Sequence, residues 1–291
     1  ILSIVHGGGS VDFTVSCVPD AIGNLCSETF SGTSYYSSNL SLATSTLFTY
    51  NAAGQIIKKG ALACISDADG NVTDLGGGTV KCTYDPENRL TQMVTKNGTV
   101  LTTTKNTYNA NGQRVKKDKA GNILVYHYLP SGILLFTTDG SDTLVDTNIF
   151  AGSTLLATYK EDAADLIFYY GDMQGNVRFI TDDTSALLVK YDYLPYGQVS
   201  ISKLGVNDAL IDYNYFTLNG LLGVQDEGNG TFCMGRRFYE AASARFLSKD
   251  PLGFKPGPNL YQFGKANPVI YADPTGMEPR KTKTVVPEIG R

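Results

Sequence analysis

The sequence predicts an all-β fold, built as an extended antiparallel meander of short hairpins. Three observations support this fold class. The 291 residues include 18 tyrosines and 31 glycines but no tryptophan, a composition that suits strands joined by tight turns. One turn unit recurs along the chain at short intervals. Long apolar stretches with a helical period are missing. The stretch from Ala163 to Ile167 is a candidate but is too short to form a helix.

Residues 1–46 carry the weakest pattern. Gly7 to Ser10 has the composition of a flexible start, and Val11 to Val15 is compatible with a strand. The Ser/Thr-rich run from Ser31 to Thr46 has strand composition but little alternation. The chain begins at Ile1 instead of a methionine and shows no signal peptide, so we expect it to be a piece of a longer protein.

Residues 47–167 are expected to form hairpin repeats. After a tyrosine, Asn or Asp accepts backbone N–H groups, and proline at the next position presets φ for a type I turn. Gly or Asn three residues after the Asn or Asp takes a positive φ and returns the chain. The tyrosine ends one strand, and its ring is available to pack across to the next. Copies of the unit are Tyr50–Ile56, Tyr84–Leu90, Tyr108–Arg114, Tyr128–Ile133 and, further on, Tyr193–Val199.

Short, partly alternating strands such as Thr79–Tyr84 and Ile123–Tyr128 are expected between these turns. Each hairpin is too small to be stable alone and must stack on its neighbours. Variants of the turn without tyrosine are Asp67–Asn71, Asp118–Asn122 and Asp172–Asn176. Asp67–Asn71 also offers alternate oxygens to a calcium ion. Its glycine stands fourth, where an EF-hand loop has it sixth, so a plain turn is the favoured interpretation.

Charge and composition disfavour several functions. A net charge of −4 and a pI near 5.2 argue against a nucleic-acid partner. The basic cluster Arg280, Lys281 and Lys283 has the composition of a solvated tail. No apolar run reaches the ~18 residues of a membrane span. With His6 and His127 as the only histidines, we expect no metal site, and we expect no cofactor.

Five cysteines leave at least one unpaired. Cys17 with Cys26 and Cys64 with Cys82 are conceivable disulfides, and Cys233 would remain. Because the count is odd and no CxxC spacing occurs, buried free thiols are the favoured interpretation.

The most specific motif lies near the end of the chain. Arg237 opens Arg-Phe-Tyr-Glu, Asp250 opens a first Asp-Pro-x-Gly, and Asp273 opens a second. These residues, their spacing and the tyrosine turns resemble the RHS / YD-repeat family, which includes bacterial Rhs toxins and Tc toxin C components. From Phe168 the order of motifs resembles the RHS-associated core, with Tyr169–Arg178, Tyr191–Gly197 and Leu218–Gly220 in sequence.

The resemblance extends from about Tyr50 to Met277 and implies a curved or spiral β-shell closed by a C-terminal core over residues 168–277. It further implies that Asp250, Asp273 and Arg237 form a self-cleaving aspartyl site. The cut would follow Met277, where the family usually has leucine, and Glu278 would begin the downstream product. Residues 278–291 would then be a polar tail.

Two adjacent carboxyls are suited to this hydrolysis, because like charges at close range leave one ionised and one protonated. The ionised group takes a proton from water, and the protonated group polarises the carbonyl or protonates the leaving nitrogen. A nearby arginine holds one carboxylate ionised and oriented. Asp-Pro-x-Gly is also a good turn without catalysis, so a cap that keeps the fold and does not cut is the alternative.

The implied role is to enclose and release a C-terminal effector, the partners being the chain's own C-terminal segment and further shell segments or copies of itself. Closed shells of this family need more chain than 291 residues. The rival is a structural or adhesive surface protein that assembles through strand edges into a fibre. Carbohydrate binding by exposed tyrosines is a third, more general alternative. Either leading function predicts a secreted or cell-surface location in a bacterium or archaeon.

Overall fold

The computed structural model describes residues 2–5, 13–19, 25–32, 46–204 and 214–282, with side chains from residue 46 onward. The predicted antiparallel meander is confirmed. One 14-stranded sheet holds β7 to β20 in chain order, with β7 and β20 at its two ends. Its strands are β7 Ile65–Ser66, β8 Val72–Leu75, β9 Val80–Tyr84, β10 Leu90–Asn97, β11 Val100–Tyr108, β12 Arg114–Lys119, β13 Asn122–Tyr128, β14 Leu134–Thr138, β15 Leu144–Ala151, β16 Thr154–Lys160, β17 Asp165–Gly171, β18 Val177–Thr181, β19 Leu187–Tyr193 and β20 Val199–Lys203.

A six-stranded sheet precedes it, again in chain order. Its strands are β1 Leu2–Val5, β2 Phe13–Pro19, β3 Leu25–Gly32, β4 Thr46–Tyr50, β5 Ile56–Lys59 and β6 Leu62–Ala63. The strand expected at Val11–Val15 overlaps the start of β2. Most of the Ser/Thr-rich run, residues 33–45, lies outside the described residues.

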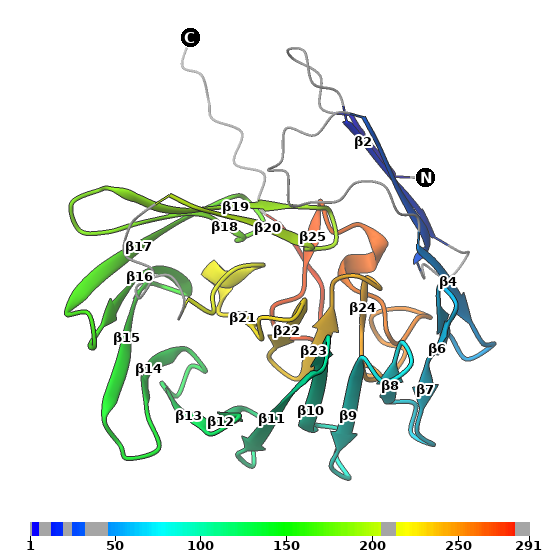
Figure 1. Ribbon diagram of the computed structural model, residues 1–291, viewed down its shortest axis with the longest axis horizontal. Coiled ribbons are helices and arrows are strands. Elements are labelled where there is room, and N and C mark those ends of the chain that lie inside the picture. The colour runs from blue at the N-terminus through cyan, green and yellow to red at the C-terminus, as the bar shows by residue number, and fades with distance from the viewer. Residues whose placement is uncertain (1, 6–12, 20–24, 33–45, 205–213, 283–291) are drawn as a thin grey trace.

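The elements that follow β20, called the core from here on, lie inside the curve of the large sheet (Figure 1). It contains a four-stranded sheet and a two-stranded sheet. Its elements are η1 Gly220–Leu222, β21 Gln225–Asp226, β22 Thr231–Met234, β23 Arg237–Glu240, β24 Arg245–Phe246, η2 Gly264–Ala266, β25 Tyr271–Ala272 and β26 Arg280–Lys281. No helix in the described part of the chain has the length and apolar character needed to cross a membrane.

The recurring turns have the predicted local chemistry. In the turn at Asp85, Oδ1 accepts hydrogen bonds from the backbone N–H groups of Glu87 and Arg89, both at 3.0 Å. The preceding Tyr84 donates its hydroxyl to the Val72 carbonyl at 3.0 Å and so connects neighbouring hairpins. The same side-chain pattern recurs at Asn51, Asn109, Asp139, Asp172 and Asp182.

The turn predicted at Asp118–Asn122 is present but tighter than the other turns, because Lys119 pairs directly with Asn122. The chain reverses over Ala120 and Gly121, which both have positive φ, 52° and 94°. Two successive residues with positive φ make the tight two-residue hairpin that matches strand twist.

The cysteine interpretation is confirmed where side chains are described. Cys64, Cys82 and Cys233 are free and buried, so the conceivable Cys64–Cys82 disulfide is wrong. Burial raises the pKa of Cys82 to about 12. The side chains of Cys17 and Cys26 lie outside the described part of the structure.

Two apolar clusters attach the core to the sheet. One joins Phe48 and Ile56 of the early strands to Tyr239 and Phe246 of the core, and the other contains Phe216 and strands β13 to β19. Polar contacts also connect the core to hairpins far away in the sequence. Lys59 pairs with Glu240, Arg245 donates to the Gly54 carbonyl, and the Tyr261 hydroxyl donates to the Gly70 carbonyl, over separations of 181 to 191 residues.

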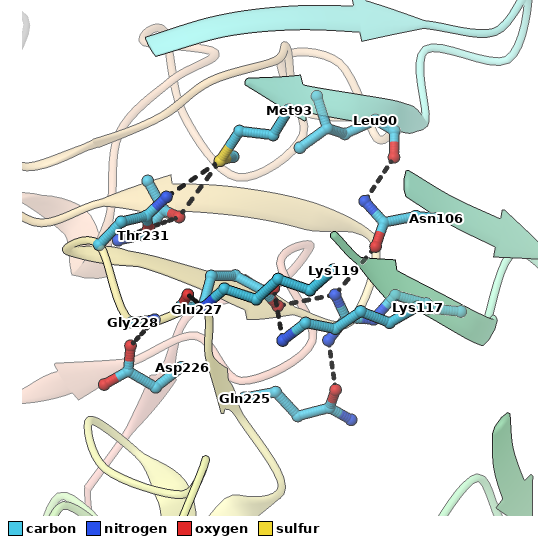
Figure 2. A network of polar contacts seen from close by, with 12 residues as sticks. Leu90, Met93, Asn106, Lys117, Lys119, Gln225, Asp226, Glu227, Gly228 and Thr231 are labelled. Atoms are coloured by element: carbon cyan, nitrogen blue, oxygen red, sulfur yellow. Dashed lines mark hydrogen bonds and ion pairs between the residues drawn. The ribbon is translucent and has the colours of Figure 1, made fainter. Parts of the chain in front are cut away.

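A buried charged cluster provides a further attachment (Figure 2). Glu227 follows β21, and its carboxylate accepts Arg114 Nη1 at 2.7 Å and Lys117 Nζ at 2.8 Å, both from β12. Its backbone carbonyl accepts Lys119 Nζ at 3.0 Å. Glu227 is 5% exposed, and the two cations outweigh the effect of burial, so the pKa of Glu227 is lowered to about 2.

Glu227→Gln is expected to destabilise the protein by about 3–5 kcal/mol at neutral pH, because Arg114 and Lys117 would remain buried without an anionic partner. Urea unfolding measures the change. The extra free energy of unfolding of the wild type is fully present above pH ~4.3, the pKa of an unfolded glutamate. It is lost as the pH falls towards about 2, the pKa of Glu227 in the folded protein.

The matched control is Glu87→Gln, since the side chain of Glu87 is 67% exposed in its pair with Arg89. We expect less than about 1 kcal/mol from it. A Glu227→Gln loss as small as that of the control would contradict the assigned role of the cluster.

Candidate functional site

The structure brings Arg237, Asp250 and Asp273 together. Arg237 is the first residue of β23, and the two aspartates open separate turns. Arg237 Nη2 lies 2.7 Å from Asp250 Oδ2 and 3.3 Å from Asp273 Oδ2, so a single nitrogen bridges the two carboxyls. The exposed fractions are 3% for Arg237, 9% for Asp250 and 0% for Asp273.

Each carboxyl is fixed by its own turn. Asp250 Oδ1 accepts the Leu252 N–H at 2.8 Å, and the Gly253 N–H donates to the Asp250 carbonyl at 3.0 Å. Proline follows each aspartate and presets the turn. Asp273 Oδ1 accepts Met277 N–H at 3.1 Å and Thr275 Oγ1 at 3.2 Å. The second turn therefore places the Asp273 carboxyl at the N–H of Met277, the residue that precedes the expected cleavage bond.

Arg237 is held on all sides. Nε donates to the Gly276 carbonyl, and Nη1 donates to the Leu260 carbonyl at 3.2 Å. The guanidinium carbon lies 3.6 Å from the centre of the Phe246 ring, a cation–π contact. Sequence reasoning missed the Leu260 carbonyl and Phe246, since neither a carbonyl group nor an aromatic ring carries a motif signal of its own.

The second turn is docked tightly on the β22–β23 hairpin. The Arg236 N–H donates to the Thr275 carbonyl at 3.0 Å. Gly276 has φ +61°, and a Cβ there would lie 2.3 Å from the Met234 carbonyl oxygen. Only glycine combines this conformation with this close approach.

Burial shapes the electrostatics of the site. It raises the pKa of both Asp250 and Asp273, and Arg237 opposes this by favouring their ionised forms. Burial also lowers the pKa of Arg237 to about 10, against the raising effect of the two carboxylates. One arginine faces two buried carboxyls, and the charge of Asp273 adds to the rise in the pKa of Asp250.

The residues beyond the expected cleavage bond are also placed. β26 pairs with β25 through Tyr271–Lys281 and Ala272–Arg280. The Thr282 N–H donates to the Ile270 carbonyl at 2.8 Å. The expected solvated character of the basic tail fits Arg280 and Lys281, which are exposed, whereas Lys283 lies outside the described residues. The segment is fixed on both sides of Met277–Glu278.

Among the side chains that the structure describes, no group of three His, Cys, Asp or Glu residues is arranged to hold an ion. The turn at Asp67, weighed above as a calcium loop, uses its carboxylate internally. Asp67 Oδ1 accepts the Asn71 N–H at 2.8 Å, and Oδ2 accepts Asn71 Nδ2 at 3.0 Å.

Comparison with protein-family models finds no match. Among curated proteins, the chain is 30% identical over 233 residues to the tRNA3(Ser)-specific nuclease WapA of Bacillus spizizenii, covering 78% of this chain and 10% of that protein. It is 29% identical over 115 residues to the toxin subunit YenC1 of Yersinia entomophaga, covering 40% and 11%. It is 24% identical over 224 residues to the double-stranded DNA deaminase toxin A of Burkholderia cenocepacia, covering 68% and 15%.

Solved structures share the fold. A chain of the Photorhabdus luminescens Tc holotoxin pore superposes with a TM-score of 0.72 at 20% identity, covering 94% of this chain and 13% of that chain. The crystal structure of TcdB2-TccC3 gives 0.71 at 20% identity, covering 92% and 14%. The chain spans about a tenth of the length of the WapA relatives. These similarities relate the chain to segments of bacterial toxins and give it their shell-type β fold.

Proposed function

We propose that this chain, a relative of RHS-containing toxin components, is a shell segment whose core cuts its own backbone once, between Met277 and Glu278. The observation that carries the proposal is the bridging of two buried carboxyls by Arg237, together with the bond from Met277 N–H to Asp273. Its chemical class is single-turnover aspartyl autoproteolysis, and its substrate is the chain itself.

The roles follow from how each group is held. Arg237 keeps one carboxylate ionised and oriented, so that it can accept a proton from water. The second carboxyl keeps its proton because two adjacent negative charges in a buried site are unfavourable. Pro-fixed turns hold both groups before the reaction, which reduces the reorganisation needed to reach the transition state.

The position of Met277 relative to the large sheet supports the enclosing role. A cavity of about 660 Å³ lies between the sheet and the core, and its lining includes Tyr128, Leu134 and Phe150 of the sheet together with Met277. A segment released after Met277 would therefore start on the concave side. The proposed partners are the downstream segment as cargo and further shell segments, in a secreted or surface-exposed toxin.

Intact mass spectrometry of the purified chain is expected to show a species that ends at Met277 and a complementary species that begins at Glu278. The cut is intramolecular, so its rate constant should not depend on protein concentration. A chain that stays intact after native purification and prolonged incubation would refute the self-cleavage proposal.

The fibre alternative would assemble through the strands at the ends of the large sheet, β7 and β20. Electron microscopy separates the two functions, because a fibre protein would form linear polymers and a shell segment would not.

A further inference from the structure

The cavity between the large sheet and the core has no carboxylate among the lining residues that the structure describes. Its volume is about 660 Å³, within the range of pockets that hold small organic ligands. Three arginines contribute to the lining, namely Arg114 of β12, Arg236 just before β23 and Arg280 of β26. The whole chain has 28 acidic and 24 basic residues, so the cavity concentrates positive charge within an acidic protein.

Arg236 and Arg280 are exposed, and neither has an acidic partner among the side chains that the structure describes. Their backbones are fixed. The Arg236 N–H donates to the Thr275 carbonyl at 3.0 Å, and Arg280 pairs with Ala272 between β26 and β25. The Arg236 guanidinium reaches the sheet at Gly112, where a Cβ would lie 2.6 Å from Nη1. Two positive charges therefore border the cavity without a neutralising anion.

The buried charged cluster adds to the positive charge of this wall (Figure 2). Arg114, which is 2% exposed, shares the single carboxylate of Glu227 with Lys117. Arg114 Nε has no hydrogen-bond partner among the described residues. Lys119 binds the Glu227 carbonyl, and Asp226 is the adjacent carboxyl. Three cationic side chains thus face two carboxyls, and the potential in the cavity favours an anion.

Apolar and hydroxyl groups complete the lining. Leu134 and Phe150 come from the sheet, and Ser131 and Ser153 lie in turns close to them in the sequence. Ligand pockets typically combine an apolar wall with a few charged or hydrogen-bonding groups. An inorganic ion would contact the arginines and leave the apolar wall in water, whereas an anion with an apolar body would contact both.

We propose that this cavity is a binding site for a small organic anion, with Arg236 and Arg280 holding its carboxylate or phosphate group and Leu134 and Phe150 contacting its apolar body. The planar guanidinium group suits this role, because its N–H donors match the spacing of carboxylate and phosphate oxygens. The site is separate from the bridged carboxyls, since Arg237, Asp250 and Asp273 do not line the cavity. The inference therefore does not depend on self-cleavage.

The first test is calorimetric titration of the full chain with four probes at low salt. Phenyl phosphate and phenylacetate carry both an anion and an apolar body, phenylacetamide lacks the charge, and inorganic phosphate lacks the body. At least one of the two aryl anions is expected to bind saturably, about 10-fold or more tightly than phenylacetamide and inorganic phosphate. Which aryl anion binds better identifies the ligand as a phosphate or a carboxylate.

Arg236→Gln is expected to weaken the binding of the preferred aryl anion by about 10-fold or more, the effect of losing a charge-assisted hydrogen bond. Lys105→Gln is the matched control. Lys105 is also exposed, and it lies on β11 outside the cavity lining, so the same loss of charge there should leave binding unchanged. Equal thermal unfolding midpoints for the two variants show that the fold is kept.

The second test uses the unmodified chain and so does not depend on the stability of a variant. Phenylglyoxal modifies accessible arginines, and mass spectrometry of peptides gives the rate at each one. The preferred aryl anion should slow modification of Arg236 and Arg280. Arg89 is the internal control, because its side chain is 23% exposed and it does not line the cavity. Its modification should be unaffected.

The outcomes are distinct. The anion site is overturned if neither aryl anion binds more tightly than phenylacetamide, or if Arg236 is modified equally fast with and without the aryl anion. Inorganic phosphate that binds as tightly as phenyl phosphate would overturn the assigned role of Leu134 and Phe150. A chain that never cuts overturns self-cleavage alone, because none of these measurements requires the cut.

Discussion

Asp273→Asn is expected to abolish the product ending at Met277 while the fold is kept. The amide oxygen can still accept the Met277 N–H and the Thr275 hydroxyl, so the turn persists. The proton that the leaving nitrogen needs is lost, and general acid catalysis of this kind contributes about 10²- to 10⁴-fold. Intact mass spectrometry over time measures the loss.

The control for this prediction is Asp139→Asn. Asp139 Oδ1 accepts two backbone N–H groups in a turn of the large sheet, from Ser141 at 2.7 Å and from Thr143 at 3.0 Å. The same chemical change is therefore made in a similar turn outside the site, and cleavage should continue at the wild-type rate. A wild-type rate from Asp273→Asn would show that Asp273 is not the acid.

Arg237→Met is expected to remove cleavage and to lower the free energy of unfolding by about 3–5 kcal/mol at neutral pH. The variant leaves two buried carboxyls without their cation, and breaking a buried ion pair from one side has a cost of this size. The lost bonds to the Gly276 and Leu260 carbonyls add to the effect. Urea unfolding and intact mass measure the two consequences.

The pH dependence of this loss has a defined sign. Burial raises the pKa of Asp250 and Asp273 in the folded protein, and removing Arg237 takes away the main opposing influence. A raised folded pKa favours folding at acidic pH, and that contribution is lost as the pH rises through the folded pKa. The difference from wild type should therefore be largest at neutral pH and shrink as the pH falls through the raised pKa values of the two carboxyls, which lie above the ~3.9 of an unfolded aspartate.

Arg89→Met is the matched control, since Arg89 pairs with Asp85 and Glu87 at a half-exposed position. It should cost about 1 kcal/mol or less. If Arg237→Met cost no more than this at neutral pH, the central ion bridge would not stabilise the core.

The fold could be predicted from sequence because its repeating unit is local. The acceptor oxygen of Asp85 and the N–H groups that it binds lie within five residues, so sequence spacing alone defines the turn. At Leu129 and Leu194 that side-chain acceptor is absent, yet the backbone bonds of the turn remain. At Asp118 the predicted turn forms in a tighter, two-residue version, because Ala120 adopts a positive φ that alanine rarely takes.

The site was predictable only in part. Resemblance to a family suggested that Arg237, Asp250 and Asp273 would meet, and the structure brings them together, whereas their catalytic role stays a proposal. The contacts that Phe246 and the Leu260 carbonyl make with Arg237 could be identified only from the structure. So could the pairing of Arg114 with Glu227, which are 113 residues apart and follow no common motif.

The bonds from Glu240, Arg245 and Tyr261 back to Lys59, Gly54 and Gly70 have a consequence for synthesis of the chain. Each strand of the large sheet finds its partner soon after leaving the ribosome, because the strand order follows the chain. The hydrogen bond between the Tyr261 hydroxyl and the Gly70 carbonyl forms only after Tyr261 has emerged, about 190 residues behind Gly70. A chain that stalls before Tyr261 can therefore form the large sheet but lacks the bonds that attach the core to the hairpins around Gly70.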